Sequence, residues 1–78
     1  MRLDIATPSE KHTLDIAWLE INTIVGNFVI QPEHAPMVVT LSPLSEVSYR
    51  LTSGKEEKRK VVNGVAHVER NHISLLIT

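Results

Sequence analysis

The sequence lacks several features that mark common protein classes. It contains no cysteine, which excludes disulfide bonds and thiolate metal sites and leaves the redox compartment unconstrained. No run approaches ~18 apolar residues, so no segment is expected to span or insert into a bilayer. The first residues, MRLDIATPSE, carry charge at Arg2 and Asp4 and lack the apolar region of a signal peptide. We therefore expect a soluble intracellular domain.

The charges show no excess of one sign. Eight basic and nine acidic residues give a net charge of −1, which provides no long-range field for nucleic acid or an anionic membrane. The run KEEKRK, residues 55–60, includes two acids, and no aromatic residues interleave with it. We interpret this run as a charged edge strand that resists edge-to-edge pairing, and we expect no nucleic-acid partner.

The sequence also lacks a recognisable catalytic arrangement. No serine lies in a Gly-x-Ser-x-Gly setting, and Glu56 and Glu57, as neighbours on a strand, point to opposite faces. Three scattered glycines cannot form a phosphate-cradling loop. Among four histidines, His67 and His72 could supply at best two metal ligands. We expect no catalysis, no metal and no cofactor.

What the sequence does contain is alternation. Its 78 residues indicate one domain, 1–78, and 42% apolar residues are too many for a disordered tail. Short segments alternate apolar and polar residues, as in RLDIA and EVSYRLT, and turn signals such as Thr7-Pro8 and Ser53-Gly54 separate them. This pattern predicts an all-β fold, a small two-sheet sandwich or a barrel of about eight or nine short strands.

The segment Leu14–Val25 has an ambiguous period. Leu14, Trp18, Ile21 and Val25 would also form one stripe on a helix. We favour a strand, because the segment is rich in β-branched residues and no capping residue and glycine frame a helix. Trp18, the largest apolar side chain, is predicted to anchor the core; the alternative is a protein interface.

Asn63-Gly64 also allows two interpretations. Flanked by KRKVV and VAHVE, it is typical of a two-residue hairpin turn, and the local signal favours that interpretation. The alternative is a corner at which a strand passes from one sheet to the other.

The stretch NFVIQPEHAPMVV, Asn27–Val39, places two prolines between apolar runs. Pro32 and Pro36 fix their own φ near −65° and push the preceding residues toward extended geometry. The result is a stiff loop that presents Glu33 and His34. It is either a rigid corner between strands or a pre-organised contact surface for another protein.

Taken in order, LDIATP, GNFV, PEHAPMVVTLSP and VNGVAHVERNHISLLIT resemble the N-terminal β-sandwich domain of the F-type ATP synthase epsilon subunit. In that family a Leu-acidic-apolar strand and a Thr-Pro turn precede a Pro-Gly-His-Ala-Pro loop, and a Ser-Gly-Gly corner precedes the final strand. The order and spacing match across nearly all of the chain. The resemblance implies a ten-strand sandwich, and it makes Asn63-Gly64 the strand corner.

The resemblance further implies a non-catalytic rotor component of the central stalk, peripheral on the cytoplasmic side of the bacterial inner membrane. Its partners would be the gamma subunit and the c-ring, and it would help couple proton transport to ATP synthesis. By position, the gamma-facing surface comprises Thr7, Pro32, His34, Ala35, Pro36 and Val39. The loop facing the c-ring comprises Ile24, Val25, Gly26 and Asn27.

Several residues depart from the family pattern. Glu33 replaces a glycine, so either the turn differs or Glu33 has a strained φ. Ile24, Val25 and Asn27 stand where the family carries acids, so contact there would depend on apolar burial. The family's C-terminal helical hairpin is missing, and we therefore expect neither an inhibitory latch nor nucleotide binding. The alternative is a stand-alone β-sandwich adaptor unrelated to ATP synthesis, which the lost acids favour.

Overall fold

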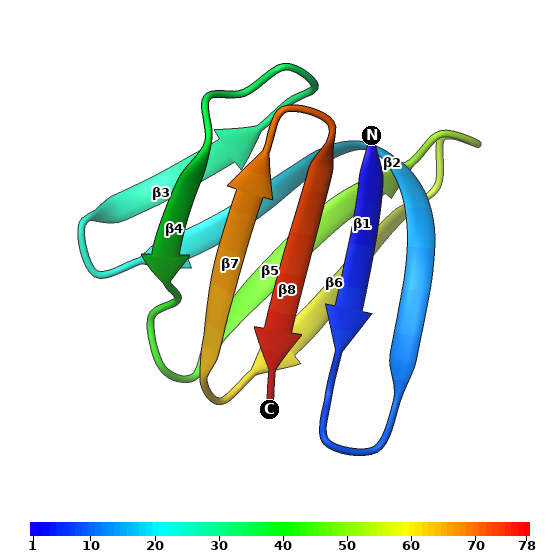
Figure 1. Cartoon of the computed structure of the whole chain (residues 1–78). Coiled ribbons are helices and arrows are strands. Elements are labelled where there is room, and N and C mark those ends of the chain that lie inside the picture. The colour runs from blue at the N-terminus through cyan, green and yellow to red at the C-terminus, as the bar shows by residue number, and fades with distance from the viewer.

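The computed structural model describes residues 1–78, which form eight strands and no helix (Figure 1). No helix that could cross a membrane is therefore present. The predicted all-β class is confirmed. The strands are β1 (Arg2–Ala6), β2 (Lys11–Thr23), β3 (Gly26–Ile30), β4 (Met37–Thr40), β5 (Ser45–Leu51), β6 (Glu56–Val61), β7 (Gly64–Glu69) and β8 (His72–Ile77).

The strands form two packed layers. Sheet 1 has the order β4-β7-β8-β1 and ends with the first part of β2, whereas sheet 2 comprises β3, the last part of β2, β5 and β6. All pairs are antiparallel except β1 with β8, which is parallel. The count is eight strands and not the ten that the resemblance implied, because β2 serves both sheets and Leu41 forms only an isolated bridge with Thr23.

The core lies between the two sheets and follows the period-two pattern of the sequence. In β1 and β8 the odd-numbered apolar residues, such as Leu3, Ile5 and Ile73, are fully buried, while their even-numbered neighbours face out. The buried set contains one aromatic residue, Tyr49, and otherwise aliphatic side chains. The full set is Leu3, Ile5, Ile16, Leu19, Ile21, Ile30, Leu41, Val47, Tyr49, Val61, Ala66, Val68, Ile73, Leu75 and Ile77.

A β-bulge in β2 redirects the strand from one sheet to the other. Ile16 pairs with Leu51, but Trp18 pairs with Arg50, so Ala17 is an extra residue. Even-numbered residues face the core before the bulge, and odd-numbered residues, beginning with Leu19, face it afterwards. Trp18 consequently lies half-buried on the outer face of sheet 2. The prediction that Trp18 anchors the core is wrong for this reason.

The chain changes sheets again between β6 and β7. These strands belong to different sheets and do not pair, so the hairpin favoured by the local signal is not formed, and Asn63 and Gly64 lie at a corner. Neither residue has a positive φ. Gly64 is required by space instead: a Cβ there would lie 2.8 Å from Ile77 Cγ2 and 2.9 Å from Leu41 Cδ1.

Each sheet has two edges: β4 and the first part of β2 in sheet 1, and β3 and β6 in sheet 2. β6 carries five charged residues in six, as expected for a protected edge strand. In contrast, β3 and β4 contain no charged residue. Figure 1 shows β3 and β4 on the same side of the sandwich, joined by the proline loop.

Candidate protein-interaction surfaces

The proline loop, residues 31–36, connects β3 to β4 and begins with a tight turn. The His34 amide donates to the Gln31 carbonyl at 3.1 Å, and Glu33 has a φ of 69°. Proline at the second position and positive φ at the third define a type II turn. Pro32, Ala35 and Pro36 are exposed, while the half-buried His34 ring contacts the Ala35 carbonyl through Nδ1 at 2.7 Å.

Glu33 fastens this turn to the β7–β8 turn. Its amide donates to the Arg70 carbonyl at 2.7 Å, and its carboxylate accepts a hydrogen bond from Asn71 Nδ2 at 2.9 Å. Arg70 Nη1 lies 3.9 Å from the same carboxylate. Of the two outcomes expected where the family has glycine, the strained φ is the one observed, and these contacts hold it in place.

The β2–β3 turn carries two strongly exposed apolar side chains on the side of the sandwich where β3 and β4 lie (Figure 1). Ile24 and Val25 are 78% and 79% exposed at its tip. Thr23 fixes the turn from within, because its hydroxyl donates to the Gly26 carbonyl at 2.8 Å and accepts from the Val25 amide at 3.2 Å. Asn27 donates to Glu20 and Asn22 at the base. The turn is therefore a braced apolar tip.

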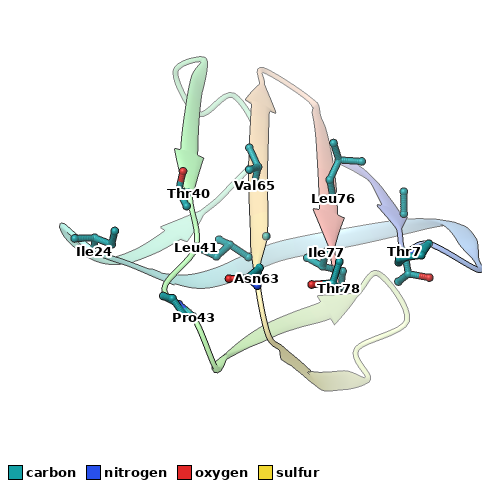
Figure 2. A pocket seen from close by; sticks show the side chains of 13 residues that line it. Thr7, Ile24, Thr40, Leu41, Pro43, Asn63, Val65, Leu76, Ile77 and Thr78 are labelled. Carbon is teal, nitrogen blue, oxygen red and sulfur yellow. The ribbon is translucent and has the colours of Figure 1, made fainter.

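An apolar groove of about 500 Å³ runs across the lower ends of β4, β7 and β8 (Figure 2). Its floor includes an outward row from adjacent strands, in which Thr40 pairs with Val65, Val65 with Leu76, and Leu76 with Ala6. Ile24 and Thr7 lie toward its two ends in Figure 2, and Asn63 and Gly64 line it as well.

The structure does not gather all the predicted gamma-facing residues in one place. Thr7 follows the end of β1 that pairs with Leu76, whereas the proline loop contacts Arg70 and Asn71 at the opposite end of sheet 1. Thr7 is instead brought to the groove, together with Ile24. Val39 points inward and packs against the core from β4. The proline loop itself remains continuous.

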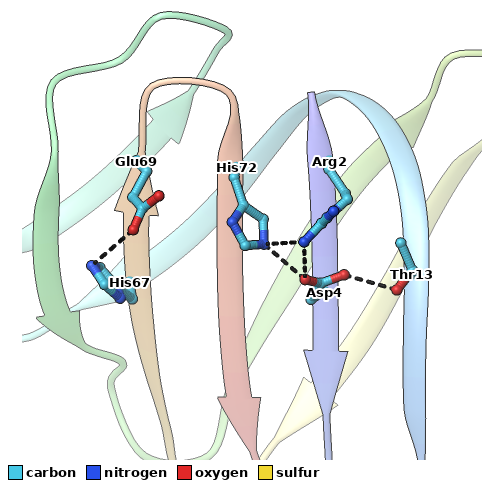
Figure 3. A network of polar contacts seen from close by, with 6 residues as sticks. All are labelled: Arg2, Asp4, Thr13, His67, Glu69 and His72. Atoms are coloured by element: carbon cyan, nitrogen blue, oxygen red, sulfur yellow. Dashed lines mark hydrogen bonds and ion pairs between the residues drawn. The ribbon is translucent and has the colours of Figure 1, made fainter.

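The upper half of the outer face of sheet 1 is polar (Figure 3). His72 Nε2 lies 2.7 Å from Asp4 Oδ2, and the same carboxylate accepts hydrogen bonds from Thr13 at 2.8 Å and Arg2 at 3.2 Å. The hydrogen bond with His72, followed by that from Thr13, lowers the pKa of Asp4 from 3.8 to about 2. Asp4 therefore stays ionised at neutral pH as the centre of a surface network.

The histidines do not converge. His12 pairs with Glu10 at 2.8 Å, His67 with Glu69 at 3.7 Å and His72 with Asp4. No group of three or more His, Asp or Glu side chains is placed to hold a metal ion. Each pair is a separate surface contact between neighbouring residues.

Several exposed apolar residues escaped the sequence patterns. Leu44, in the β4–β5 turn, is 82% exposed with a φ of 54°, and Val62 at the corner is 52% exposed. Val38, at 69%, lies on the outer side of β4. Alternation alone would have assigned Val38 to an outward position, because its neighbours Met37 and Val39 are the inward ones. Leu44 had a weaker signal: it follows a proline in a turn, where glycine is usual.

Fold and surface together define a class: a small two-sheet β-sandwich that offers braced apolar contact surfaces in place of a clustered reaction site. The sequence comparison specifies the family. A sequence model of the family "ATP synthase, Delta/Epsilon chain, beta-sandwich domain" matches residues 1–78, and the chain belongs to this family.

The individual relatives agree with this assignment. The ATP synthase epsilon chain of Clostridium kluyveri is 30% identical over 77 residues, which are 97% of this chain and 58% of the relative. The chain thus spans a little over half the length of that curated relative. In fold it matches a chain of the Tetrahymena thermophila mitochondrial ATP synthase central stalk and c-ring structure, with a TM-score of 0.86 and 18% identity, over 100% of this chain and 63% of that one. It also matches a chain of the Euglena gracilis mitochondrial ATP synthase, with a TM-score of 0.85 and 20% identity, over 96% of this chain and 48% of that one.

Proposed function

We propose that this chain acts as a non-catalytic epsilon-type component of the ATP synthase central stalk, on the cytoplasmic side of the membrane. In this role it binds the gamma subunit through the proline loop and the c-ring through the β2–β3 turn. It supports the coupling of proton transport to ATP synthesis by holding these rotor partners together. The match to the family over its whole length supports this assignment.

The observation that carries the proposal is the exposure of Ile24 and Val25. Two large apolar side chains at the tip of one turn, each more than three-quarters exposed, have nothing within the chain to cover them. Fully burying such side chains contributes about 1.5–3 kcal/mol each, before the cost of association is subtracted. A turn that is braced by Thr23 and Asn27 loses little conformational entropy on docking. A tip of this kind suits a protein partner.

The proline loop supports the second contact for a similar reason. Pro32 and Pro36 restrict the unbound loop, and Glu33 fastens it to the β7–β8 turn. The loop thus presents Ala35 and its flanking prolines in one shape before any partner arrives. Torque between partners requires such stiffness, because a soft connection would deform and not transmit the rotation.

The direct test is complex formation with the gamma subunit of the same organism. We expect the chain to co-purify with gamma and to bind it in calorimetry. Ala35→Glu, which places a charge on the exposed loop, should weaken binding at least about tenfold, a typical effect for a buried charge lacking a partner. Ser53→Glu, an equal change in the exposed β5–β6 turn, is the matched control and should bind as the unchanged chain does.

The same binding experiment distinguishes the proposed function from the alternative of a stand-alone adaptor. The β2–β3 turn has no acidic residue between Ile24 and Asn27, which favours a stand-alone adaptor with another partner. No complex with gamma at micromolar concentration would support that adaptor and overturn the proposed function. Equal loss of binding in Ala35→Glu and Ser53→Glu would reject the proline loop as the contact.

A further inference from the structure

The sandwich has free strand edges of two kinds. β6 is protected by a run of five charged residues, whereas β4, with the sequence MVVT, is an edge without any. An unprotected edge is a template for pairing with another chain, and proteins normally blunt it. β3 lacks charges as well and lies on the same side of the sandwich as β4 (Figure 1), which indicates that a partner covers this side.

The backbone of β4 shows which groups are available. The Leu41 amide donates to the Gly64 carbonyl at 2.9 Å, which makes these two a hydrogen-bonded antiparallel pair. Antiparallel bonding alternates along a strand, so Val39 and Met37 also direct their N–H and C=O groups toward β7. Val38 and Thr40 then direct theirs away from β7. Beyond Thr40 this side of the chain is covered, because Leu41 forms a bridge with Thr23 and the Ser42 amide donates to the Asn22 carbonyl at 2.9 Å. The same bridge turns the Thr40 carbonyl toward Ile24, so the edge offers the N–H and C=O of Val38 and the N–H of Thr40.

The core is also incompletely covered on this side. Phe28 from β3 and Met37 and Val39 from β4 are half-buried and pack against the core from the two uncharged edges. A strand added to β4 would lie about 4.8 Å away and place every second side chain toward the space between the sheets. Apolar residues at those positions would cover Met37 and Val39, and the intervening ones would lie beside Val38 and Thr40.

We propose that β4 pairs with an extended segment of the gamma subunit, which adds a strand to sheet 1. The segment would be about four residues long, with apolar residues at alternate positions. This inference rests on the proposed function, because β4 begins directly after Pro36, and a partner on the proline loop lies next to the edge. Main-chain hydrogen bonds to Val38 and Thr40 would align the partner, and the proline loop would set its register.

Residue-resolved amide exchange by NMR tests the pairing directly. In complex with gamma of the same organism, the Val38 and Thr40 amides should exchange at least about tenfold more slowly than in the free chain. The Lys58 amide is the internal control. The Leu51 amide donates to the Lys55 carbonyl, so by the same alternation Lys58 faces outward on the other free edge and should not change.

A pair of proline variants provides an independent measure. Val38→Pro removes one outward N–H and leaves the bonds to β7 in place, a position at which edge strands tolerate proline. We expect it to weaken gamma binding about fivefold to tenfold, the effect of one lost hydrogen bond. Lys58→Pro makes the same change on β6 and should bind normally. If Val38→Pro does not fold, the amide exchange of Val38 and Thr40 in the unchanged chain, measured with and without gamma, tests the strand pairing alone.

The outcomes are distinct. A complex in which Val38 and Thr40 exchange as in the free chain overturns strand pairing and leaves the proposed function standing. Absence of any complex overturns both. A dimer of the chain alone in sedimentation, with both amides already protected, identifies a second copy as the occupant of the edge and also overturns this proposal.

Discussion

At the scale of single residues, two side chains occupy backbone conformations that suit glycine. Glu33 and Leu44 both follow a proline in a turn, and both have a positive φ. The strain at Glu33 is offset by its contacts with Arg70 and Asn71. Leu44 has one backbone bond, from its amide to the Val62 carbonyl, and an exposed side chain. Its strain is therefore uncompensated within the chain.

Leu44→Gly should raise the free energy of unfolding by about 0.5–1 kcal/mol. That figure is the cost of the left-handed conformation for a residue with a Cβ, minus the free energy that glycine loses through its greater entropy in the unfolded chain. Urea unfolding followed by circular dichroism measures it. Leu44→Ala retains the Cβ and should show no gain; an equal gain in both variants would mean that the exposed side chain, and not φ, carries the cost.

The Asp4 network makes the free energy of unfolding depend on pH in the acid range. The pKa of Asp4 lies near 2 in the folded chain and near 3.8 when unperturbed, so its contribution is present above about pH 4. This contribution to the free energy of unfolding is lost as the pH falls toward 2, because Asp4 is protonated at a higher pH in the unfolded chain than in the folded chain. Urea midpoints measured across this range should fall more steeply for the unchanged chain than for Asp4→Asn. Parallel curves would show that other carboxylates account for the acid dependence.

At the scale of elements, β2 determines how the two sheets are connected. Its β-branched residues and the lack of helix-framing residues predicted a strand in preference to a helix, and this prediction is confirmed. The bulge at Ala17 then reverses the faces on which its side chains lie. A period-two pattern assumes that each residue flips the face, so one inserted residue displaces every later assignment. Trp18 was misplaced because sequence alternation carries no mark of the bulge.

Neighbouring substitutions test this change of phase. Leu19→Ala should cost about 2–5 kcal/mol, because Leu19 is fully buried and leaves a cavity. Trp18→Ala should cost about 1 kcal/mol or less despite the larger side chain, because it lies on the outer face. Unfolding should be followed by circular dichroism, because Trp18 is the only tryptophan and Trp18→Ala removes the tryptophan fluorescence. A larger loss for Trp18→Ala would contradict the outward assignment.

At the scale of the whole molecule, the proposed contact surfaces are spread around one small sandwich. The proline loop lies at the opposite end of sheet 1 from the apolar groove, and the β2–β3 turn joins the groove through Ile24. The core residues Leu41 and Ile77 line the groove, but no core residue lies in the proline loop or at the tip of the β2–β3 turn. Contact and folding should therefore be separable. Residues at the tips can be changed for binding without a loss of stability.

The double variant Ile24→Ser with Val25→Ser examines this separation. Its free energy of unfolding should stay within about 0.5 kcal/mol of the unchanged chain, because both side chains are exposed. Its co-purification with the c-ring of the same organism, in the presence of gamma, should fall sharply. Val29→Ser, which removes a half-exposed apolar side chain from β3, is the control. Undiminished co-purification of the double variant would reject the turn as the contact.

Sequence by itself determined the local structure of this protein. Alternation located the strands, prolines located the stiff loop, and KEEKRK marked the charged edge, because each of these depends on neighbours within a few residues. Tertiary structure alone decided the bulge at Ala17 and the separation of Thr7 from the proline loop. It also gave Gly64 its role, which is close packing against Ile77 and Leu41. These features depend on pairing between distant segments, above all β1 beside β8. No local pattern records which strand will become a neighbour.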